Sequence, residues 1–187
     1  MFMSDKMFEN FENIICVTSR KLCEIPLEKR LAELAELGLR RVILREKDMS
    51  EEEYISLAEK ILSISEIELT VHNFPNTARK LSISRIHLPL SMLTEELCAE
   101  FETVGASVHS VEEAQKAERL GASYIIAGHI FATDCKRNLA PRGLDFLSSV
   151  CQSVKIPVYA IGGITPDNLR NVLNAGAKGA CVMSGLM

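Results

Sequence analysis

The segment Gly128–Arg137, GHIFATDCKR, combines residues that can move protons with residues that can hold anions. It follows an apolar run, SYIIA, that is typical of a buried strand, and His129 stands where that strand ends. An imidazole has an ordinary pKa of about 6.5, so His129 can accept and return a proton near neutral pH. Cys135 could assist because Lys136 would lower its pKa, although a structural thiol is the simpler interpretation. A histidine at a strand end also often caps a backbone group, so both roles stay open.

Other polar side chains follow predicted strands in the same way. Arg45 and Lys47 come after the second apolar run. The remaining ones are His72, Asn73, His87, Ser107, His109 and Lys136. A group of cationic and titratable side chains at strand ends favours a site for a small anionic molecule. Arg45 and Lys47 could instead form surface ion pairs of little energetic value.

Two glycine-containing loops predict a phosphate site. Gly162 and Gly163 precede a helix that begins near Thr165, and Ser184 and Gly185 follow the last predicted strand. Glycines let backbone N–H groups approach a phosphate closely, and barrels of alternating strands and helices bind phosphate in the loops after strands seven and eight. The alternative is a pair of tight turns without a ligand.

The elements that must position these residues alternate along the chain. Eight short apolar runs are separated by segments with apolar residues at helical spacing, such as residues 26–38, which begin with Pro and end with Gly. The runs are apolar throughout, as in a parallel sheet covered on both faces. This pattern predicts one domain over residues 1–187 with a (β/α)8 barrel. A flavodoxin-like or Rossmann sheet normally needs fewer strands, and no GxGxxG follows an early strand.

The two ends of the chain raise a question about the outer ring of helices. The sequence ends directly after the eighth predicted strand, so the barrel is expected to lack its eighth outer helix. Residues 1–12 place Met3, Met7, Phe8 and Phe11 on one face of a predicted helical extension. This extension, or a partner subunit, would cover the flank.

Composition and charge narrow the class of protein. The formal net charge of −4 argues against a general nucleic-acid surface, and no apolar run is long enough to span a membrane. The six cysteines show no CxxC pair, and most lie in apolar runs, which indicates reduced thiols in a cytoplasmic protein. The four histidines are widely spaced without an acidic partner in a ligand pattern, so no metal site is predicted.

Several motifs resemble one known family. LREKDMSEEEY, SVHSVEEAQKAERLGASYI, GHIFATDCK and IPVYAIGGITPDNLRNVLNAGAKGACVMSG are similar to segments of the thiamine-phosphate synthase/TenI superfamily of (β/α)8 barrels. The resemblance extends from about Asn13 to the end of the sequence. Two activities occur in this superfamily. The synthase joins a hydroxymethylpyrimidine diphosphate to a thiazole phosphate and needs Mg²⁺, whereas the TenI-type thiazole tautomerase shifts a proton within a thiazole carboxylate phosphate without a metal.

The motifs depart from the synthase pattern at the metal positions. Synthases carry Asn-Asp after the third strand and Gly-Gln-Glu-Asp after the fourth, and the aspartates hold Mg²⁺; here these positions read Asn73-Phe74 and Pro89–Met92. Mg²⁺ needs oxygen ligands, and these substitutions remove the expected ones. Ile43 replaces a glutamine, and Gly128-His129 replaces Gly-Pro.

The resemblance of GHIFATDCK to the tautomerase motif implies a metal-independent isomerase. Its substrate would be 2-(2-carboxy-4-methylthiazol-5(2H)-ylidene)ethyl phosphate, with His129 as the catalytic acid and base and no cofactor. The implied phosphate ligands are Gly162, Gly163, Ser184 and Gly185, and the implied substrate ligands are Arg45, Lys47, Asn73, Ser107, Thr133 and Lys136. The alternatives are the synthase, a transferase, and a non-catalytic regulator that binds thiazole or thiamine phosphate. The superfamily often forms dimers, so a homodimer is a further expectation.

Overall fold

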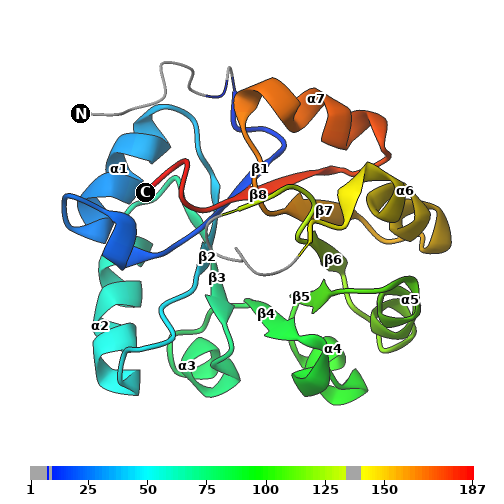
Figure 1. Ribbon diagram of the computed structural model, residues 1–187. Helices are drawn as coiled ribbons and strands as arrows, with labels where there is room; N and C mark the ends of the chain where they lie inside the picture. Colours follow the sequence, from blue (N-terminus) through cyan, green and yellow to red (C-terminus); the bar gives the residue numbers. More distant parts are fainter. Residues whose placement is uncertain (1–7, 9, 134–139) are drawn as a thin grey trace.

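Eight parallel strands close into a barrel in which each strand pairs with the next and β8 pairs with β1 (Figure 1). The computed structural model describes residues 8, 10–133 and 140–187. The strands are β1 (Ile14–Val17), β2 (Arg41–Leu44), β3 (Glu68–His72), β4 (Arg85–Pro89), β5 (Thr103–Val108), β6 (Tyr124–Gly128), β7 (Val158–Ile161) and β8 (Gly179–Val182). The short apolar runs therefore form the predicted barrel.

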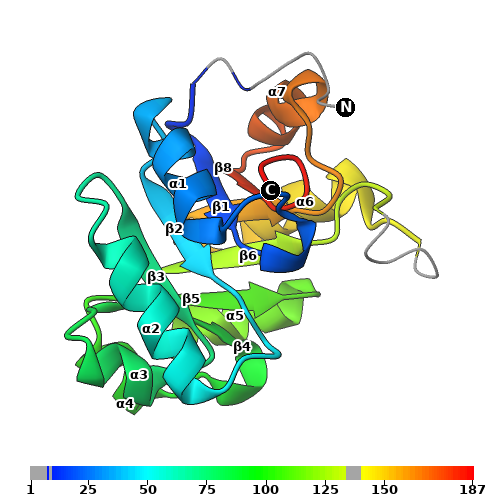
Figure 2. The ribbon, with the colours of Figure 1, turned by 90° about the vertical axis from the view of Figure 1, so that its left-hand side faces the viewer.

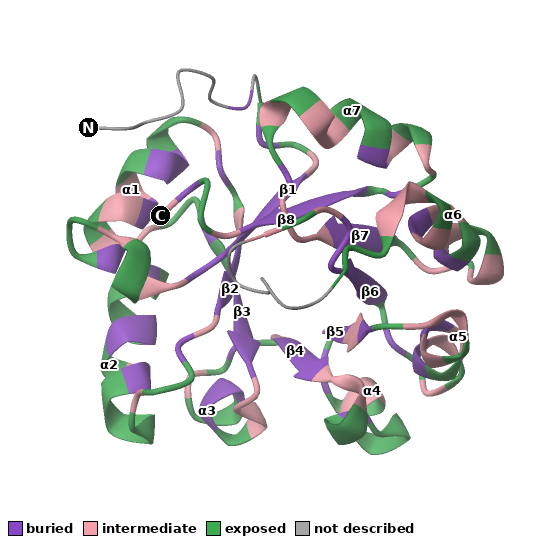
Figure 3. Ribbon diagram, viewed as in Figure 1, coloured by how far each residue is buried: buried purple, intermediate pink, exposed green. Residues whose placement is uncertain are grey.

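An outer ring of helices covers the strands (Figure 1). The α-helices are α1 (Leu27–Glu36), α2 (Glu51–Leu62), α3 (Pro75–Lys80), α4 (Glu95–Glu100), α5 (Val111–Arg119), α6 (Gly143–Ser153) and α7 (Pro166–Asn174), and the 3₁₀ helices are η1 (Arg20–Leu22) and η2 (Leu90–Met92). Each longer helix turns a buried face toward the barrel and an exposed face outward (Figure 3). In α1, for example, Leu27, Leu31 and Leu34 are buried. Within the described residues no helix follows β8, as predicted.

Side chains alternate between the helix-facing and interior sides of each strand. In β2, Val42 and Leu44 join the large apolar core between strands and helices, whereas Ile43 joins a separate cluster inside the barrel. That interior cluster consists of Ile15, Val17, Ile43, Tyr124, Ile126, Tyr159 and Cys181. The alternation of side chains between the two sides continues for a few residues past the strand ends. It therefore determines which residues of the following loops face the opening of the barrel.

The N-terminal segment contacts the amino ends of two strands, β8 and β2. The carbonyl of Asn13 accepts a hydrogen bond from the Ala180 amide of β8, and Arg41 of β2 donates to the carbonyl of Glu12. Phe8 and Phe11 are buried in the large core. Residues 10–13 contain no helix. The rest of the predicted extension falls mostly outside the described residues, so its helical character stays a prediction.

The segment after β8 packs against α1 and the loop before it (Figures 1 and 2). The guanidinium of Arg30 donates to the carbonyl of Leu186, whose side chain is 1% exposed, and Met187 contacts Cys23. This short turn therefore covers part of the flank where an eighth helix would lie. Among the described residues, no helix is long and apolar enough to cross a bilayer.

Candidate functional site

A cavity of about 1010 Å³ opens at the carboxyl ends of the strands and is lined by residues from all around the barrel. Most of the site residues predicted from the sequence line it together. They are Arg45, Lys47, Asn73, Ser107, His129, Thr133, Gly162, Gly163, Ser184 and Gly185. Lys136 and Cys135 lie outside the described residues. The cavity is also lined by His72, His87 and His109, which the sequence placed at strand ends without naming them as ligands.

Arg45 and Lys47 face the cavity because the alternation of β2 continues beyond its end. Glu46, between them, points the other way and is 4% exposed. Its carboxylate accepts hydrogen bonds from the Thr18 hydroxyl at 2.8 Å, the Arg20 amide at 2.9 Å and the Arg20 guanidinium at 3.0 Å. Thr18 also accepts from the Arg45 amide at 2.9 Å. The buried Glu46 therefore anchors the backbone that carries both cations.

The cavity is cationic. Its described lining contains Arg45 and Lys47 and no Asp or Glu. The neighbouring charge of Arg45, and then burial, lower the pKa of Lys47 from its ordinary value. Two cations that share a cavity without a described acid are best compensated by an anionic ligand. An anionic small molecule is also the ligand class expected from the sequence, and it stays a prediction.

His72 and His87 form the neutral floor of the cavity. Their rings stack with centroids 6.0 Å apart. Burial, together with Arg45 and Lys47, lowers the pKa of His72 to about 4. Burial, together with His72, lowers the pKa of His87 to about 3. Both imidazoles are therefore uncharged at neutral pH and act there as hydrogen-bonding groups.

His109 and His129 lie at the ends of β5 and β6. Nδ1 of His109 is 3.1 Å from the carbonyl of Gly128, which can only accept, so Nδ1 donates this hydrogen bond. His129 is 5% exposed, and its carbonyl accepts from the Arg142 amide at 3.0 Å. The structure thus places His129 in the cavity wall, as the sequence predicted, but in a closely packed position.

Close packing explains the paired glycines after β7. A Cβ atom on Gly162 would lie 2.5 Å from Cβ of His129, and one on Gly163 would lie 2.4 Å from the carbonyl oxygen of Ala132. Both residues have positive φ, 103° and 64°. Glycine is therefore required for the β7 loop to pass the β6 loop. Phosphate binding by Gly162, Gly163, Ser184 and Gly185 remains a prediction that this packing neither supports nor opposes.

The loop after β3 contains Asn73, a predicted substrate ligand, and Phe74. Asn73 has φ 65°, and its buried Oδ1 has no hydrogen-bond partner among the described residues. The ring of Phe74 turns away and packs edge-on against Tyr54 at 4.9 Å. Phe74 therefore packs against the core at the position where the resemblance implied an aspartate that holds Mg²⁺.

The described residues do not fit a Mg²⁺ site. Mg²⁺ is bound by oxygen ligands that usually include one or two carboxylates. The described cavity lining offers none, and no group of three or more His, Cys, Asp or Glu gathers elsewhere in the described chain. Asp134 lies outside the described residues.

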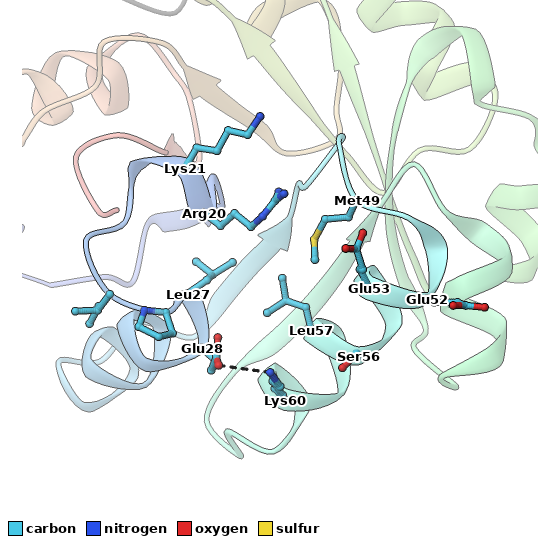
Figure 4. Close-up of a pocket in the computed structure, with 12 residues that line it drawn as sticks. Arg20, Lys21, Leu27, Glu28, Met49, Glu52, Glu53, Ser56, Leu57 and Lys60 are labelled. Carbon is cyan, nitrogen blue, oxygen red and sulfur yellow. Dashed lines mark ion pairs between the residues drawn. The ribbon is translucent and has the colours of Figure 1, made fainter.

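A second hollow of about 780 Å³ lies on the outside, between α1 and α2 (Figure 4). Most of its charged side chains already have partners. Lys60 pairs with Glu28 at 3.7 Å, and Lys21 pairs with Asp48 at 2.8 Å. The cavity at the strand ends, whose positive charge has no acidic partner in the described lining, is the better candidate for a functional site.

The closed barrel and this cavity define the class: a (β/α)8-barrel protein with a small-molecule site at the carboxyl ends of its strands. Residues 14–186 match the family described as thiamine monophosphate synthase (TMP-TENI), and the chain belongs to this family.

Relatives and a solved structure agree with that family. A thiamine-phosphate synthase of Clostridium acetobutylicum is 36% identical over 179 residues, which cover 91% of this chain and 85% of the relative. One of Fusobacterium nucleatum is 33% identical, covering 93% and 88%. The structure of a thiamine phosphate pyrophosphorylase from Pyrococcus furiosus is 31% identical, covers 94% of this chain and 87% of that chain, and has a TM-score of 0.81.

These comparisons overturn one prediction. The interpretation as a thiazole tautomerase, an isomerase, is wrong, because relatives that match most of the chain are named thiamine-phosphate synthases. A catalytic role of His129 stays a prediction. The error has a physical origin. Motif differences at Phe74 and His129 are local, and local side-chain chemistry does not by itself define the reaction of a whole site.

Some positioning residues were not anticipated from the sequence. Glu46 stands in the charged stretch REKD, where a solvent-exposed role is the ordinary expectation, and Thr18 was not considered. The strand alternation that places Arg45 in the cavity also places Glu46 behind it, so this signal was present.

Proposed function

We propose that the chain is a thiamine-phosphate synthase that joins a hydroxymethylpyrimidine diphosphate to a thiazole phosphate. The observation that carries the proposal is the similarity over most of the chain to proteins of that name, 36% identity over 91% of the chain in one case. The cavity supports it. A volume of about 1010 Å³ has room for two small substrates, and its cations suit their phosphates.

The chemistry of this joining reaction fits the charges of the cavity. The bond between the pyrimidine methylene carbon and the diphosphate oxygen breaks, and a bond from that carbon to the thiazole nitrogen forms. The diphosphate leaves with the electron pair of the broken bond and gains negative charge. Arg45 and Lys47 would stabilise that charge as it develops. The loops of Gly162 and Gly163 and of Ser184 and Gly185 are proposed to hold the thiazole phosphate.

The direct test is formation of thiamine phosphate. The purified chain is incubated with the two substrates, with and without Mg²⁺, and thiamine phosphate is measured by chromatography. We expect product from the unchanged chain and a loss of most turnover in Arg45→Gln. Lys155→Gln is the matched control, because Lys155 precedes β7 at the opposite end of the barrel. Absence of product under all metal conditions would reject the proposal.

A second candidate is a protein that binds the same phosphates without catalysis. The absence of carboxylates from the described cavity lining favours it. It predicts that thiamine phosphate binds, as measured by calorimetry, and that no product forms in the assay above.

The cytoplasmic location, homodimer formation and the absence of nucleic-acid and membrane partners also remain proposals. The free thiols of Cys16, Cys23, Cys98, Cys151 and Cys181 support the first of these.

A further inference from the structure

Three side chains from neighbouring strands form a buried hydrogen-bonded chain that ends in the cavity. Nδ1 of His87, on β4, lies 3.2 Å from the hydroxyl of Tyr124, on β6. Nε2 of the same ring lies 2.9 Å from Oγ of Ser107, on β5. Ser107 and His87 line the cavity, whereas Tyr124 lies beneath them in the interior cluster. The chain thus links the barrel interior to the ligand space.

The contact between β4 and β6 exists because β5 has a glycine between them. Gly105 pairs with His87 on one side and with Tyr124 on the other. A Cβ atom on Gly105 would lie 2.1 Å from the Tyr124 ring and 2.4 Å from Nδ1 of His87. Any other residue would separate the phenol from the imidazole. The arrangement is therefore built into the barrel rather than being an incidental contact of long side chains.

The chemistry of the three groups indicates which way the protons point. His87 is neutral, because burial lowers its pKa to about 3, and a neutral imidazole carries a proton on one nitrogen. Burial raises the pKa of the Tyr124 phenol, which stays protonated. Among the described residues, Nδ1 of His87 is the hydrogen-bond partner of this phenol. If Nδ1 carried the proton, the Tyr124 hydroxyl hydrogen would be buried without an acceptor, which is costly.

We infer that Tyr124 is a positioning residue that orients the Ser107 hydroxyl toward an anionic ligand. The Tyr124 hydroxyl donates to Nδ1 of His87 and keeps the imidazole proton on Nε2. Nε2–H donates to Oγ of Ser107. The Ser107 hydroxyl hydrogen is then left to donate into the cavity, where a phosphate or diphosphate oxygen would accept it. The identity of the ligand rests on the proposed function, but the orientation does not.

The tautomer of His87 can be measured directly. In ¹⁵N-labelled protein, two-dimensional ¹H–¹⁵N spectra distinguish a protonated ring nitrogen from an unprotonated one. We expect Nε2 of His87 to be protonated in the unchanged chain. Tyr124→Phe should shift His87 to the other tautomer or to a mixture. Tyr159→Phe is the matched control, since its hydroxyl lies in the same interior cluster but contacts Arg41 at 2.7 Å. A proton on Nδ1 in the unchanged chain would overturn the inference, whether or not any variant folds.

Ligand binding provides the second measurement, and it does not require turnover. Inorganic diphosphate is the calorimetric probe. Tyr124→Phe should raise its Kd by roughly threefold to tenfold, the effect of a misaligned hydrogen bond, and Tyr159→Phe should not. In a Ser107→Ala background, Tyr124→Phe should have no further effect, because the two changes act through one hydroxyl. If Tyr124→Phe raised the Kd for diphosphate equally in the unchanged chain and in the Ser107→Ala background, the inference would be contradicted. A chain that binds diphosphate in this way but forms no thiamine phosphate would refute the proposed function alone.

Discussion

At the scale of single residues, the cavity is lined by cationic side chains and by neutral side chains that form hydrogen bonds. Arg45 and Lys47 bring charge, and His72 and His87 bring neutral hydrogen-bonding groups whose charged forms are disfavoured by burial and by those cations. Since the described lining has no acid, an anionic ligand would be held mainly by Arg45 and Lys47. Variants of the cations should therefore change anion binding, whereas variants of the histidines should change the pH dependence of stability.

Removing one cation should weaken anion binding strongly. Arg45→Gln keeps a similar length and polarity but loses the charge. A hydrogen bond to a charged group contributes about 1.5–3 kcal/mol, so the Kd for thiamine phosphate should rise by roughly tenfold to a hundredfold. Isothermal titration calorimetry measures this, with Lys155→Gln as the control that should match the unchanged chain. Equal affinities of the Arg45 and Lys155 variants would argue against Arg45 as a ligand.

The neutral histidine of β3 should make stability depend on pH. Unfolded His72 binds a proton below about pH 6.5, whereas the folded residue does so only below about pH 4. Between these values the unfolded state binds more protons, so stability falls as the pH falls. The free energy of unfolding should lose about 1.4 kcal/mol per pH unit for this residue. Urea titrations from pH 7 to 4 should show a correspondingly shallower slope for His72→Asn. Parallel curves for the two proteins would contradict the buried neutral state.

Sequence reasoning was informative about these residues and also had a clear limit. The strand-end positions of Arg45, Ser107 and His129 followed from the apolar runs, because parallel strands bring their carboxyl ends to one rim. The alternation of β2 could have placed Glu46 behind the cavity, but it could not name Thr18 and Arg20 as its partners. The contact between His87 and Tyr124 did not follow either. Such contacts depend on barrel closure and on register between separate strands, which periodicity along the chain does not contain.

At the scale of elements, the loops after β6 and β7 must pass each other closely. The amides of Ile130 and Phe131 donate to the carbonyls of Ile161 and Gly162 at 2.9 and 3.0 Å, so the two segments continue as neighbours beyond the strands. The side chain of Asn168 donates to the carbonyl of Gly163 at 2.8 Å and ties α7 to the same loop. The position of His129 is therefore a property of the β7 loop as much as of its own strand.

Gly38 and Gly162 have nearly equal φ angles but different surroundings. Comparing them separates the cost of backbone strain from the cost of a steric clash. Gly38 has φ 101° and nothing within 4 Å of an added Cβ, whereas Gly162 has φ 103° and meets His129 at 2.5 Å. Gly38→Ala should cost about 1–2 kcal/mol, from the left-handed backbone alone. Gly162→Ala should cost clearly more and should also displace His129, which weakens ligand binding. Urea unfolding and calorimetry of the two variants test this. Similar losses of stability with unchanged ligand affinity would show that the β6 loop accommodates the methyl group.

At the scale of the whole molecule, irregular segments next to β1 and β8 add to the barrel core, and no helix follows β8 among the described residues. β8 pairs with β1, so the sheet itself is closed. Phe8 and Phe11 enter the core beside the amino ends of the strands, and Leu186 is buried after β8. A (β/α)8 barrel could be predicted from the alternation of strands and helices. The sequence also indicated that Phe8 and Phe11 would pack on the barrel. The burial of Leu186 could not be predicted, because no periodic pattern marks a single buried side chain in an irregular segment.

If the N-terminal segment is part of the core, removing one of its rings should destabilise the entire barrel. Phe11 is 5% exposed and its ring packs 6.3 Å from that of Phe8. Phe11→Ala should lower the free energy of unfolding by about 3–5 kcal/mol, because it creates a cavity in a single cooperative core. Leu37→Ala is the matched control. Leu37 is 56% exposed at the end of α1, so its loss should cost no more than about 0.5 kcal/mol. Both values come from urea titrations followed by circular dichroism. Equal stabilities of the two variants would mean that Phe11 only rests on the barrel, and that the amino ends of its strands are closed without the N-terminal segment.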